Sequence, residues 1–407
     1  MKKRTIITAV LAGILTVAML LTLCACGSQS GGSSGGGSSS QEQSAESKTE
    51  SKEESKEESK EASSAASKAD TGETRTFTDG QGRTVEIPTK IERICPLGNA
   101  PRLLTYLGLA DKFVGIQECE IADSPIMAYA WVHKDAWSKL PNTGTDALGA
   151  GKWYAEVIIS CKPDLIVTCY TPDICDDIQN KTGVPVVSFS QDLPLFSEEY
   201  NNALKVLGDA CGVSDRAEEL VSYINKTLED VKNRVKDVPD ENKPSVLGAG
   251  ATFKGSHSID GVYCNYPVFT ALSAKDVATG ITSKMGGQLV DREQILSWNP
   301  DMIFFDVGSM NMVNDDYKAD PAYFNSLKAV TDGKLYQWPN STWHYSNVEI
   351  PLVTLYYVGG MLYPEQFKDV DFESKASEIF DTFLGEPDYL NTLKEAGAGY
   401  GPVTLGE

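Results

Sequence analysis

The chain has 407 residues and a net charge of −21, nearly all of it in residues 76–407. This acidity excludes the concentrated basic face that nucleic-acid binding requires. About 330 residues remain after a low-complexity N-terminal part, which exceeds a usual single core and favours two lobes.

The first 25 residues are typical of a secretory signal peptide, because three basic residues precede an apolar stretch at positions 6–23. Cys26 follows the small residue Ala25, whereas Cys24 follows Leu23, so Cys26 fits a bacterial lipoprotein cleavage site better. We therefore expect Cys26 to carry a lipid and hold the chain at the extracytoplasmic face of the cell membrane, on the cell surface or in the periplasm. The alternative is an uncleaved anchor, since the apolar stretch is about long enough to span a bilayer.

Residues 26–75 form a Gly/Ser-rich segment followed by a Ser/Glu/Lys repeat without aromatic residues. Such a composition cannot bury enough apolar surface to offset the entropy of ordering, so we predict a disordered tether. Roughly fifty flexible residues give a typical reach of about 40 Å from the membrane.

The cysteines of the folded part are odd in number, lack a CxxC pair and often lie in apolar runs. They are Cys95, Cys119, Cys161, Cys169, Cys175, Cys211 and Cys264. This pattern favours buried free thiols over a disulfide framework, although an exported chain has the opportunity to oxidise some of them.

Residues 76–196 are predicted to form a first α/β lobe. The expected elements, in order, are a hairpin (76–88), a strand (91–97), a helix (100–112) that ends near Gly108, strands at 112–118 and 165–170, a helix (175–181) and a strand (185–190). This alternation predicts a parallel sheet covered by helices.

Residues 197–238 interrupt the alternation with two helical segments separated by residues 211–213. The second begins at Ser214 as an N-cap and carries one apolar stripe between charged faces. At 1.5 Å per residue it is a rod of about 35 Å, long enough to connect two lobes.

Residues 239–407 are predicted to form a second α/β lobe. The expected elements are strands at 245–251, 302–308 and 334–339, helices at 267–273 and 321–330, and a long helical tail from Ile350.

One unit of sequence occurs in both halves, as EVIISCKPDLIV from Glu156 and EQILSWNPDMIF from Glu293. In each copy a glutamate opens a short helix, a Pro-Asp pair follows seven positions later, and an apolar run of strand length comes next. Proline stops a helix because it lacks the N–H group that a helix interior needs. Each half therefore contains the same predicted helix-turn-strand unit.

The order of several segments resembles the substrate-binding proteins of ABC importers for iron chelates, haem and cobalamin, the class III periplasmic binding proteins. The segments are TDGQGRTVEIP with KIERICPL, LLTYLGLADKFVGI, the two Glu-Pro-Asp units, AVTDGKLYQWP and LYPEQFKDVD. The resemblance implies an α/β fold of two Rossmann-like lobes with parallel sheets, joined by a single long helix, with the ligand cleft between the lobes. It also implies a binding protein rather than an enzyme, a permease dimer with a cytoplasmic ATPase as partner, no intrinsic cofactor, and an iron complex as transported ligand.

The same resemblance gives the repeated glutamates a role. In the family one carboxylate on each lobe docks into arginine-lined pockets of the permease dimer, and those positions match Glu156 and Glu293. The alternative is that each glutamate only stabilises the N-terminus of its own helix, by roughly 0.3–1 kcal/mol.

Ligands of open α/β sheets lie beyond the carboxyl ends of the strands, which selects loops rich in aromatic and basic side chains. The candidate ligand-binding residues are Tyr170, Lys254, His257, Tyr263, Tyr266, Trp343, His344 and Tyr345. Imidazole and phenolate groups can ligate iron or pack on a macrocycle, and an ammonium group can pair with an anionic chelate. Each of them can equally be an ordinary packing or surface residue. Trp131, Trp153 and Tyr154 are weaker candidates.

No arginine is predicted in the cleft, because Arg102 and Arg292 fall in or beside helices. This argues against a strongly anionic siderophore and leaves haem, a cobalamin-like corrinoid, another metal chelate or an oxyanion open. A rival hypothesis is an extracellular metal-dependent hydrolase that uses His257, His344 and Asp306, but the sequence has neither an HExxH nor a GxSxG motif. A surface adhesin would explain the tether and not the repeated glutamates.

Overall fold

The computed structural model describes residues 73–145, 152–253, 255–282, 286–339 and 347–407. An antiparallel hairpin, β1 (Thr74–Thr78) and β2 (Thr84–Pro88), opens this part as predicted, although it begins two residues inside the predicted tether. The buried Asp79 carboxylate accepts hydrogen bonds from the Arg83 backbone (2.8 Å) and the Ser188 hydroxyl (2.6 Å), which fixes the turn to the following sheet. The predicted signal peptide and the lipidated Cys26 lie outside the described residues.

The first half contains a parallel sheet in the order β3-β4-β5, with short helices around it. Its elements are β3 (Ile94–Pro96), α1 (Ala100–Tyr106), α2 (Ala128–Trp131), α3 (Lys134–Trp137), α4 (Ala155–Cys161), β4 (Leu165–Thr168), α5 (Pro172–Thr182) and β5 (Val186–Ser188). Every residue of β4 is buried, as expected for a central strand covered on both faces. Helix α5 ends at Gly183, whose φ of 71° places it in the left-handed conformation that glycine adopts without strain.

The strand predicted at 112–118 is wrong. Phe113 makes a single bridge to Ile94, and Ile116 makes one to Asn142, so the segment changes partner within three residues. A β-strand needs consecutive residues paired with the same partner, and here each partner pairs with a single residue.

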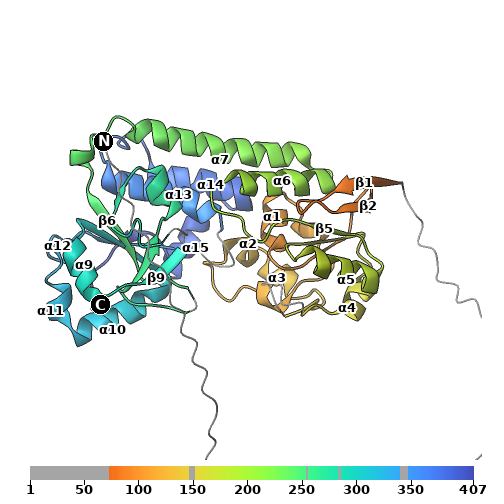
Figure 1. The fold of residues 1–407 in the computed structure, drawn as a ribbon, viewed down its shortest axis with the longest axis horizontal. Helices are drawn as coiled ribbons and strands as arrows, with labels where there is room; N and C mark the ends of the chain where they lie inside the picture. Colours follow the sequence, from red (N-terminus) through yellow and green to blue (C-terminus); the bar gives the residue numbers. More distant parts are fainter. Residues whose placement is uncertain (1–72, 146–151, 254, 283–285, 340–346) are drawn as a thin grey trace, which may run out of the picture. The chain divides into compact units, whose positions relative to one another are not determined.

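Helices α6 (Glu198–Ala210) and α7 (Ser214–Val235) form the predicted helical segment. Ser214 is the first residue of α7 rather than its N-cap, which is Val213. The buried stripe of α7 includes Leu220, Ile224 and Val231, and the helix packs along α6 and α13 (Glu349–Leu362), as Figure 1 shows.

The second half contains a seven-stranded sheet that is mixed rather than parallel. Its path is β12-β11-β10-β6-β7-β9, and β8 pairs with β6. The strands are β6 (Ser245–Ala249), β7 (Gly261–Cys264), β8 (Lys275–Asp276), β9 (Gly286–Leu289), β10 (Met302–Asp306), β11 (Leu335–Trp338) and β12 (Gly401–Pro402). Strands β6, β8, β10 and β11 are parallel, while β7, β9 and β12 run antiparallel to their neighbours. The sequence analysis missed β7, β8, β9 and β12, because they are short or weakly apolar.

The helices of the second half are shorter than predicted. They are α8 (Pro267–Ala271), α9 (Arg292–Trp298), α10 (Met310–Ala319), α11 (Pro321–Phe324), α12 (Lys328–Thr331), α13, α14 (Phe372–Leu384) and α15 (Tyr389–Glu395). The single tail predicted from Ile350 is wrong, since α13 stops one residue before Tyr363-Pro364 and α14 stops at Gly385. Figure 1 shows these C-terminal helices in blue below α7.

The C-terminal helices also contact the first half. The Tyr106 hydroxyl of α1 donates a 2.5 Å hydrogen bond to Glu349 of α13, and the Tyr389 hydroxyl of α15 donates a 2.6 Å bond to the Pro125 carbonyl. The main hydrophobic core accordingly runs from the first sheet through α7 to the C-terminal helices, while a second cluster lies under α9 to α12. The lobe boundaries at 196 and 238 stay predictions.

None of the seven cysteines of the described part is in a disulfide, and six of them are buried. Burial raises the pKa of Cys169 and Cys175 to about 11 and that of Cys211 to about 12. None of the helices in the described ranges is both long and apolar enough to cross a membrane.

Candidate functional site

The carboxyl edge of the first sheet carries a buried polar contact between two strand-end loops. Gln117 is fully buried, and its side-chain oxygen accepts a 2.6 Å hydrogen bond from the Gly98 backbone after β3. Its amide nitrogen donates to the hydroxyl of Tyr170, after β4, over 3.1 Å. Gln117 therefore links the loop of residues 96–99 to Tyr170, one of the predicted ligand residues. The sequence analysis missed Gln117, which lies at the end of the apolar run 112–118.

A buried charged cluster lies next to this edge. The fully buried Glu120 accepts a 2.6 Å hydrogen bond from the Tyr129 hydroxyl, and the guanidinium of Arg102 lies 5.3 Å from the centre of the Tyr129 ring. Burial raises the pKa of Glu120 to about 7, against the lowering effect of Tyr129 and Arg102. Arg102 does lie in a helix, as predicted, but only 3% of it is exposed. An arginine within the apolar helix APRLLTY was the signal that this cluster exists.

The second sheet ends in a buried carboxylate, Asp306, at the last position of β10. One oxygen accepts from the Tyr263 hydroxyl (2.5 Å) and the Thr252 hydroxyl (3.0 Å), and the other accepts from the Gly308 backbone (2.9 Å). Burial raises the pKa of Asp306 to about 6, opposed by these hydrogen bonds. The geometry makes Asp306 an anchor for the loops that begin at the carboxyl edge.

The predicted ligand tyrosines of this lobe pack behind that edge. Tyr263 and Tyr266 are only 3% and 4% exposed, and their rings lie 5.4 Å apart. The ring of Trp338 lies 5.3 Å from that of Tyr266 and stacks on Phe304. Both tyrosines thus belong to an aromatic layer near the carboxyl edge of this sheet. Their contact with ligand stays a prediction.

His257 is half-buried in the loop between β6 and β7. Its Nε2 lies 2.8 Å from the carbonyl oxygen of Phe253, and its ring packs on that of Phe253 at 4.3 Å. Because a carbonyl only accepts, Nε2 carries the proton in this arrangement and Nδ1 is left as the acceptor. Lys254, Trp343, His344 and Tyr345 lie outside the described residues. Within the described residues, no group of three or more His, Cys, Asp or Glu side chains is placed to hold a metal ion.

The repeated unit folds in the same way in both halves. Glu156 is the second residue of α4 and Glu293 is the second residue of α9, and both side chains are exposed. Each helix ends one residue before proline, at Lys162 (φ 49°) or Asn299 (φ 42°), because the residue before proline disfavours the right-handed helical region.

The aspartate of each Pro-Asp pair ties the unit to a neighbouring segment. One carboxylate oxygen of Asp164 accepts from the backbone N–H groups of Glu92 and Arg93, both at 2.9 Å. The matching oxygen of Asp301 accepts from the backbone (2.8 Å) and hydroxyl (2.9 Å) of Ser245. Although burial opposes ionisation, hydrogen bonds from Lys328 and Ser245 hold the pKa of Asp301 at about 2. These bonds fix each glutamate-bearing helix to the start of a buried strand.

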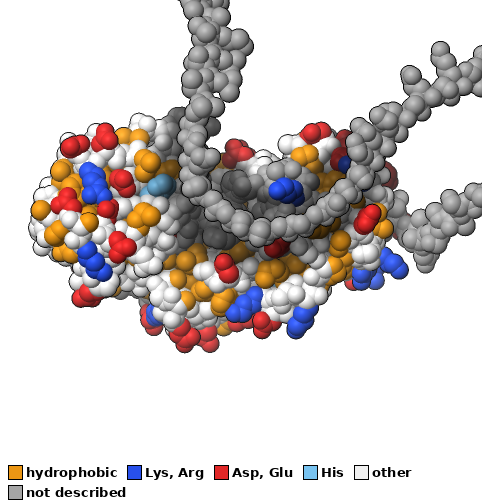
Figure 2. All heavy atoms as spheres, turned by 90° about the horizontal axis from the view of Figure 1, so that it is seen from below, with side chains coloured by type: hydrophobic (Ala, Val, Ile, Leu, Met, Phe, Trp, Pro, Cys, Tyr) orange, Lys and Arg blue, Asp and Glu red, His pale blue; other side chains and the backbone are white. Residues whose placement is uncertain are grey.

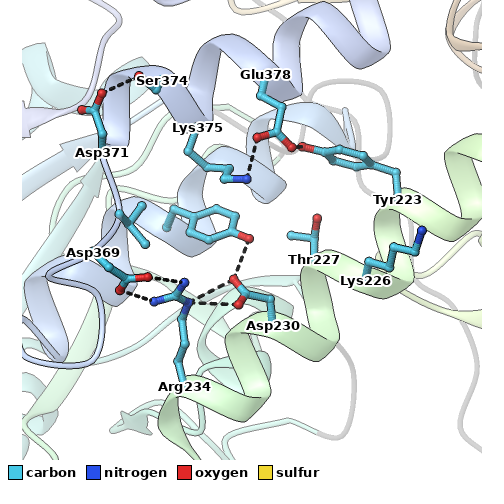
Figure 3. Close-up of a pocket in the computed structure, with 12 residues that line it drawn as sticks. Tyr223, Lys226, Thr227, Asp230, Arg234, Asp369, Asp371, Ser374, Lys375 and Glu378 are labelled. Carbon is cyan, nitrogen blue, oxygen red and sulfur yellow. Dashed lines mark hydrogen bonds and ion pairs between the residues drawn. The ribbon is translucent and has the colours of Figure 1, made fainter.

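A hollow of about 590 Å³ lies between α7 and α14 (Figure 3). Five of its seven charged lining groups form ion pairs, since Arg234 contacts Asp230 (3.0 Å) and Asp369 (2.6 Å), and Lys375 contacts Glu378 (2.6 Å). None of the predicted ligand residues that the structure describes lines it. The hollow therefore belongs to the packing interface between α7 and the C-terminal helices.

The model of the family described as "Periplasmic binding protein" matches residues 120–342, which is more than half of the chain. An Fe(3+)-citrate-binding protein of Bacillus subtilis is 26% identical over 283 residues, which cover 68% of this chain and 82% of that protein. The molybdate-binding protein MolA of Haemophilus influenzae is 24% identical over 258 residues, which cover 56% of this chain and 69% of that protein.

Solved structures show the same fold. A periplasmic solute binding protein from Veillonella parvula aligns with a TM-score of 0.62 at 19% identity, covering 80% of this chain and 99% of that one. MolA of Haemophilus influenzae bound to molybdate aligns with a TM-score of 0.58 at 19% identity, covering 76% and 98%. The resemblance drawn from the sequence is confirmed, and the chain belongs to the periplasmic binding protein family.

Proposed function

We propose that this chain is the extracytoplasmic solute-binding protein of an ABC importer, which captures an iron chelate, siderophore-like or haem-like, between its two lobes. The observation that carries the proposal is that polar side chains gather at the carboxyl edges of both sheets, the buried Gln117 with Tyr170 in one and the buried Asp306 with the half-buried Thr252 in the other. Ligands of this architecture bind at such edges. The similarity to an Fe(3+)-citrate-binding protein supports iron as the cargo.

The ligand would meet side chains from both halves of the chain. We propose Tyr170 on the first half and His257 on the second, with Tyr263 and Tyr266 forming the aromatic layer behind them. Lys254, Trp343, His344 and Tyr345 are proposed as further ligand-contacting residues from the sequence alone. The free Nδ1 position of His257 suits either direct ligation of a metal or a hydrogen bond to a chelate.

An oxyanion is the second candidate, and Arg102 favours it. A buried guanidinium beside the strand-end loops is the group that binds oxyanions through paired N–H donors. The similarity to a molybdate-binding protein points the same way. A cobalamin-like corrinoid or another metal chelate remains an alternative cargo from the sequence.

Delivery requires a membrane partner, and we propose the permease dimer of an ABC importer with its cytoplasmic ATPase. Glu156 and Glu293 would dock into basic pockets of this dimer, and a lipid on Cys26 would hold the chain at the membrane. The similarity to an "ABC transporter substrate-binding lipoprotein" of Bacillus subtilis supports both the ABC importer as partner and the lipid anchor. We propose no catalytic role for His257, His344 or Asp306.

Native mass spectrometry of protein purified from its own host tests the cargo directly. An iron chelate should co-purify, and ferric citrate should quench tryptophan fluorescence with a dissociation constant of about 1 µM or lower, as expected for a capture protein. Molybdate is the matched oxyanion probe. If molybdate binds tightly and no iron chelate does, the oxyanion assignment replaces the iron one, and hydrolysis of a bound ester or phosphate would contradict a binding protein altogether.

Replacing His344 and Tyr345 with alanine should weaken ligand binding by about tenfold or more, because it removes an imidazole and a phenol that the sequence predicts to contact the ligand. The matched control is His133→Ala with Tyr317→Ala, which removes the same two side-chain types outside the predicted ligand set. Isothermal titration with the co-purified ligand measures both. A dissociation constant equal to that of the unmodified protein would remove this segment from the site.

A further inference from the structure

Each glutamate-bearing helix exposes a large apolar side chain on the same face as its glutamate. Ile159 follows Glu156 by three residues and is 46% exposed, and Leu296 follows Glu293 by three residues and is 37% exposed. Residues three apart on a helix are surface neighbours, about 5–6 Å between Cβ atoms. Each helix thus presents a carboxylate and an aliphatic side chain together.

Core packing does not account for these two side chains. In each helix the preceding isoleucine, Ile158 or Ile295, is fully buried and takes the core position. A single exposed apolar residue is ordinary on a protein surface. Here the same exposed position is apolar in both copies of a repeat whose flanking residues differ.

The exposed apolar residues of the described chain also concentrate at these helices. Of six large ones, three lie in or directly before α4 and α9, namely Tyr154, Ile159 and Leu296, and a fourth, Leu289, ends strand β9 three residues before α9. The other two are Ile281 and Met312, which provide a comparison set. Figure 2 shows that over the described face turned away from α7, basic side chains are scattered among acidic and apolar ones.

We infer that Ile159 and Leu296 are the apolar half of a twofold docking surface, and that its occupant is the permease dimer. The inference rests on the proposed function and adds to it. The partner must present, twice, a cationic group beside an apolar pocket, because the chain offers a carboxylate and an aliphatic side chain twice. A dimer with twofold symmetry supplies such a pair of sites. The carboxylates set orientation and association rate, while the buried aliphatic area holds the complex together.

The test compares Ile159→Ser with Leu296→Ser against the control Ile281→Ser with Met312→Ser. Full-length protein loaded with ferric citrate is bound to nanodiscs that contain the permease dimer whose deletion abolishes uptake in the host. The docking variant should bind about tenfold or more weakly, the control should bind as the unmodified protein does, and both should keep the same ligand affinity and Tm. The loss should also persist from 0.05 to 0.5 M salt, since salt does not screen apolar contacts.

Two outcomes overturn the inference. If the docking variant binds like the unmodified protein while glutamate variants do not, the proposed function stands and the apolar half is wrong. If control and docking variants lose binding equally, these positions have no special role. Ile159→Gln with Leu296→Gln repeats the comparison with larger polar side chains should the serine variant have a lower Tm.

Discussion

Replacing Glu156 and Glu293 together with arginine is expected to abolish ligand uptake, by at least about 100-fold, while ligand affinity stays within about twofold. Both side chains are exposed, so the change leaves packing intact. It would place two cations opposite the proposed cationic pockets of the permease, and like charges brought together at an interface cost several kcal/mol. Uptake of radiolabelled ligand by host cells and titration of the purified protein measure the two quantities separately.

The matched control is Asp173→Arg with Asp215→Arg. Both aspartates are exposed and are the second residues of α5 and α7, so the control repeats the charge change and the helix position. If the glutamates only stabilise helix N-termini, both double variants should have equal and small effects. Equal uptake in the two variants, or a parallel loss of ligand affinity in the glutamate variant, contradicts docking.

Glu349→Gln is expected to make the protein more stable at pH 8 and to leave it unchanged at pH 4.5. Burial raises the pKa of Glu349 to about 7, against the hydrogen bond from Tyr106 and the charge of Arg102. An unfolded glutamate ionises near pH 4.5. Between these values the folded protein holds a proton that the unfolded chain has released, so the free energy of unfolding falls as the pH rises and levels off above pH 7.

Glutamine keeps an oxygen for the Tyr106 hydroxyl and has no proton to lose, so the variant should avoid this loss. The gain at pH 8 should reach at most about 3 kcal/mol, from 1.36 kcal/mol per pKa unit. Urea unfolding at pH 4.5, 6, 7 and 8 measures it, with Glu395→Gln on exposed surface as the control. A difference from the unmodified protein that does not change with pH contradicts a proton held by Glu349. Glu120 should leave part of the pH dependence in place, since burial raises its pKa in the same direction.

Local sequence signals predicted the parts of the fold that local chemistry determines. The Asp79-Gly-Gln-Gly turn predicted the hairpin, and the two Pro-Asp pairs predicted where α4 and α9 stop. In each case the deciding interaction lies within a few residues along the chain. The residue that ends α4 or α9 is the one before the proline, because proline restricts the conformation of the residue that precedes it.

Segments whose structure depends on distant partners were not predictable in the same way. The run 112–118 has a strand composition but bridges two different partners, and the C-terminal residues read as one apolar helix although they form three. Strand β9 contains two glycines and exists because β7 lies beside it. Pairing between strands that are distant along the chain cannot be predicted from the local sequence pattern of either strand.

The candidate site shows the same division. Strand-end reasoning selected Tyr170, and the structure links it to the 96–99 loop through Gln117, which no motif marks. Tyr263 and Tyr266 were selected as aromatic loop residues, and the structure packs both into the layer around Trp338. Burial of Arg102 with Glu120 requires the folded arrangement of α1 and α2, and sequence alone gave only an arginine in an apolar helix.

The six buried thiols bear on how such a chain survives outside the cytoplasm. With a pKa near 11, roughly one thiol in ten thousand is a thiolate at pH 7, and only the thiolate reacts with oxidants or disulfides. Folding thus turns Cys169 and Cys175 into inert packing groups, whereas the newly exported, extended chain exposes all of them to mispairing. Burial in the folded state is therefore what protects these sulfur atoms from oxidants, because an unfolded chain would leave all six accessible.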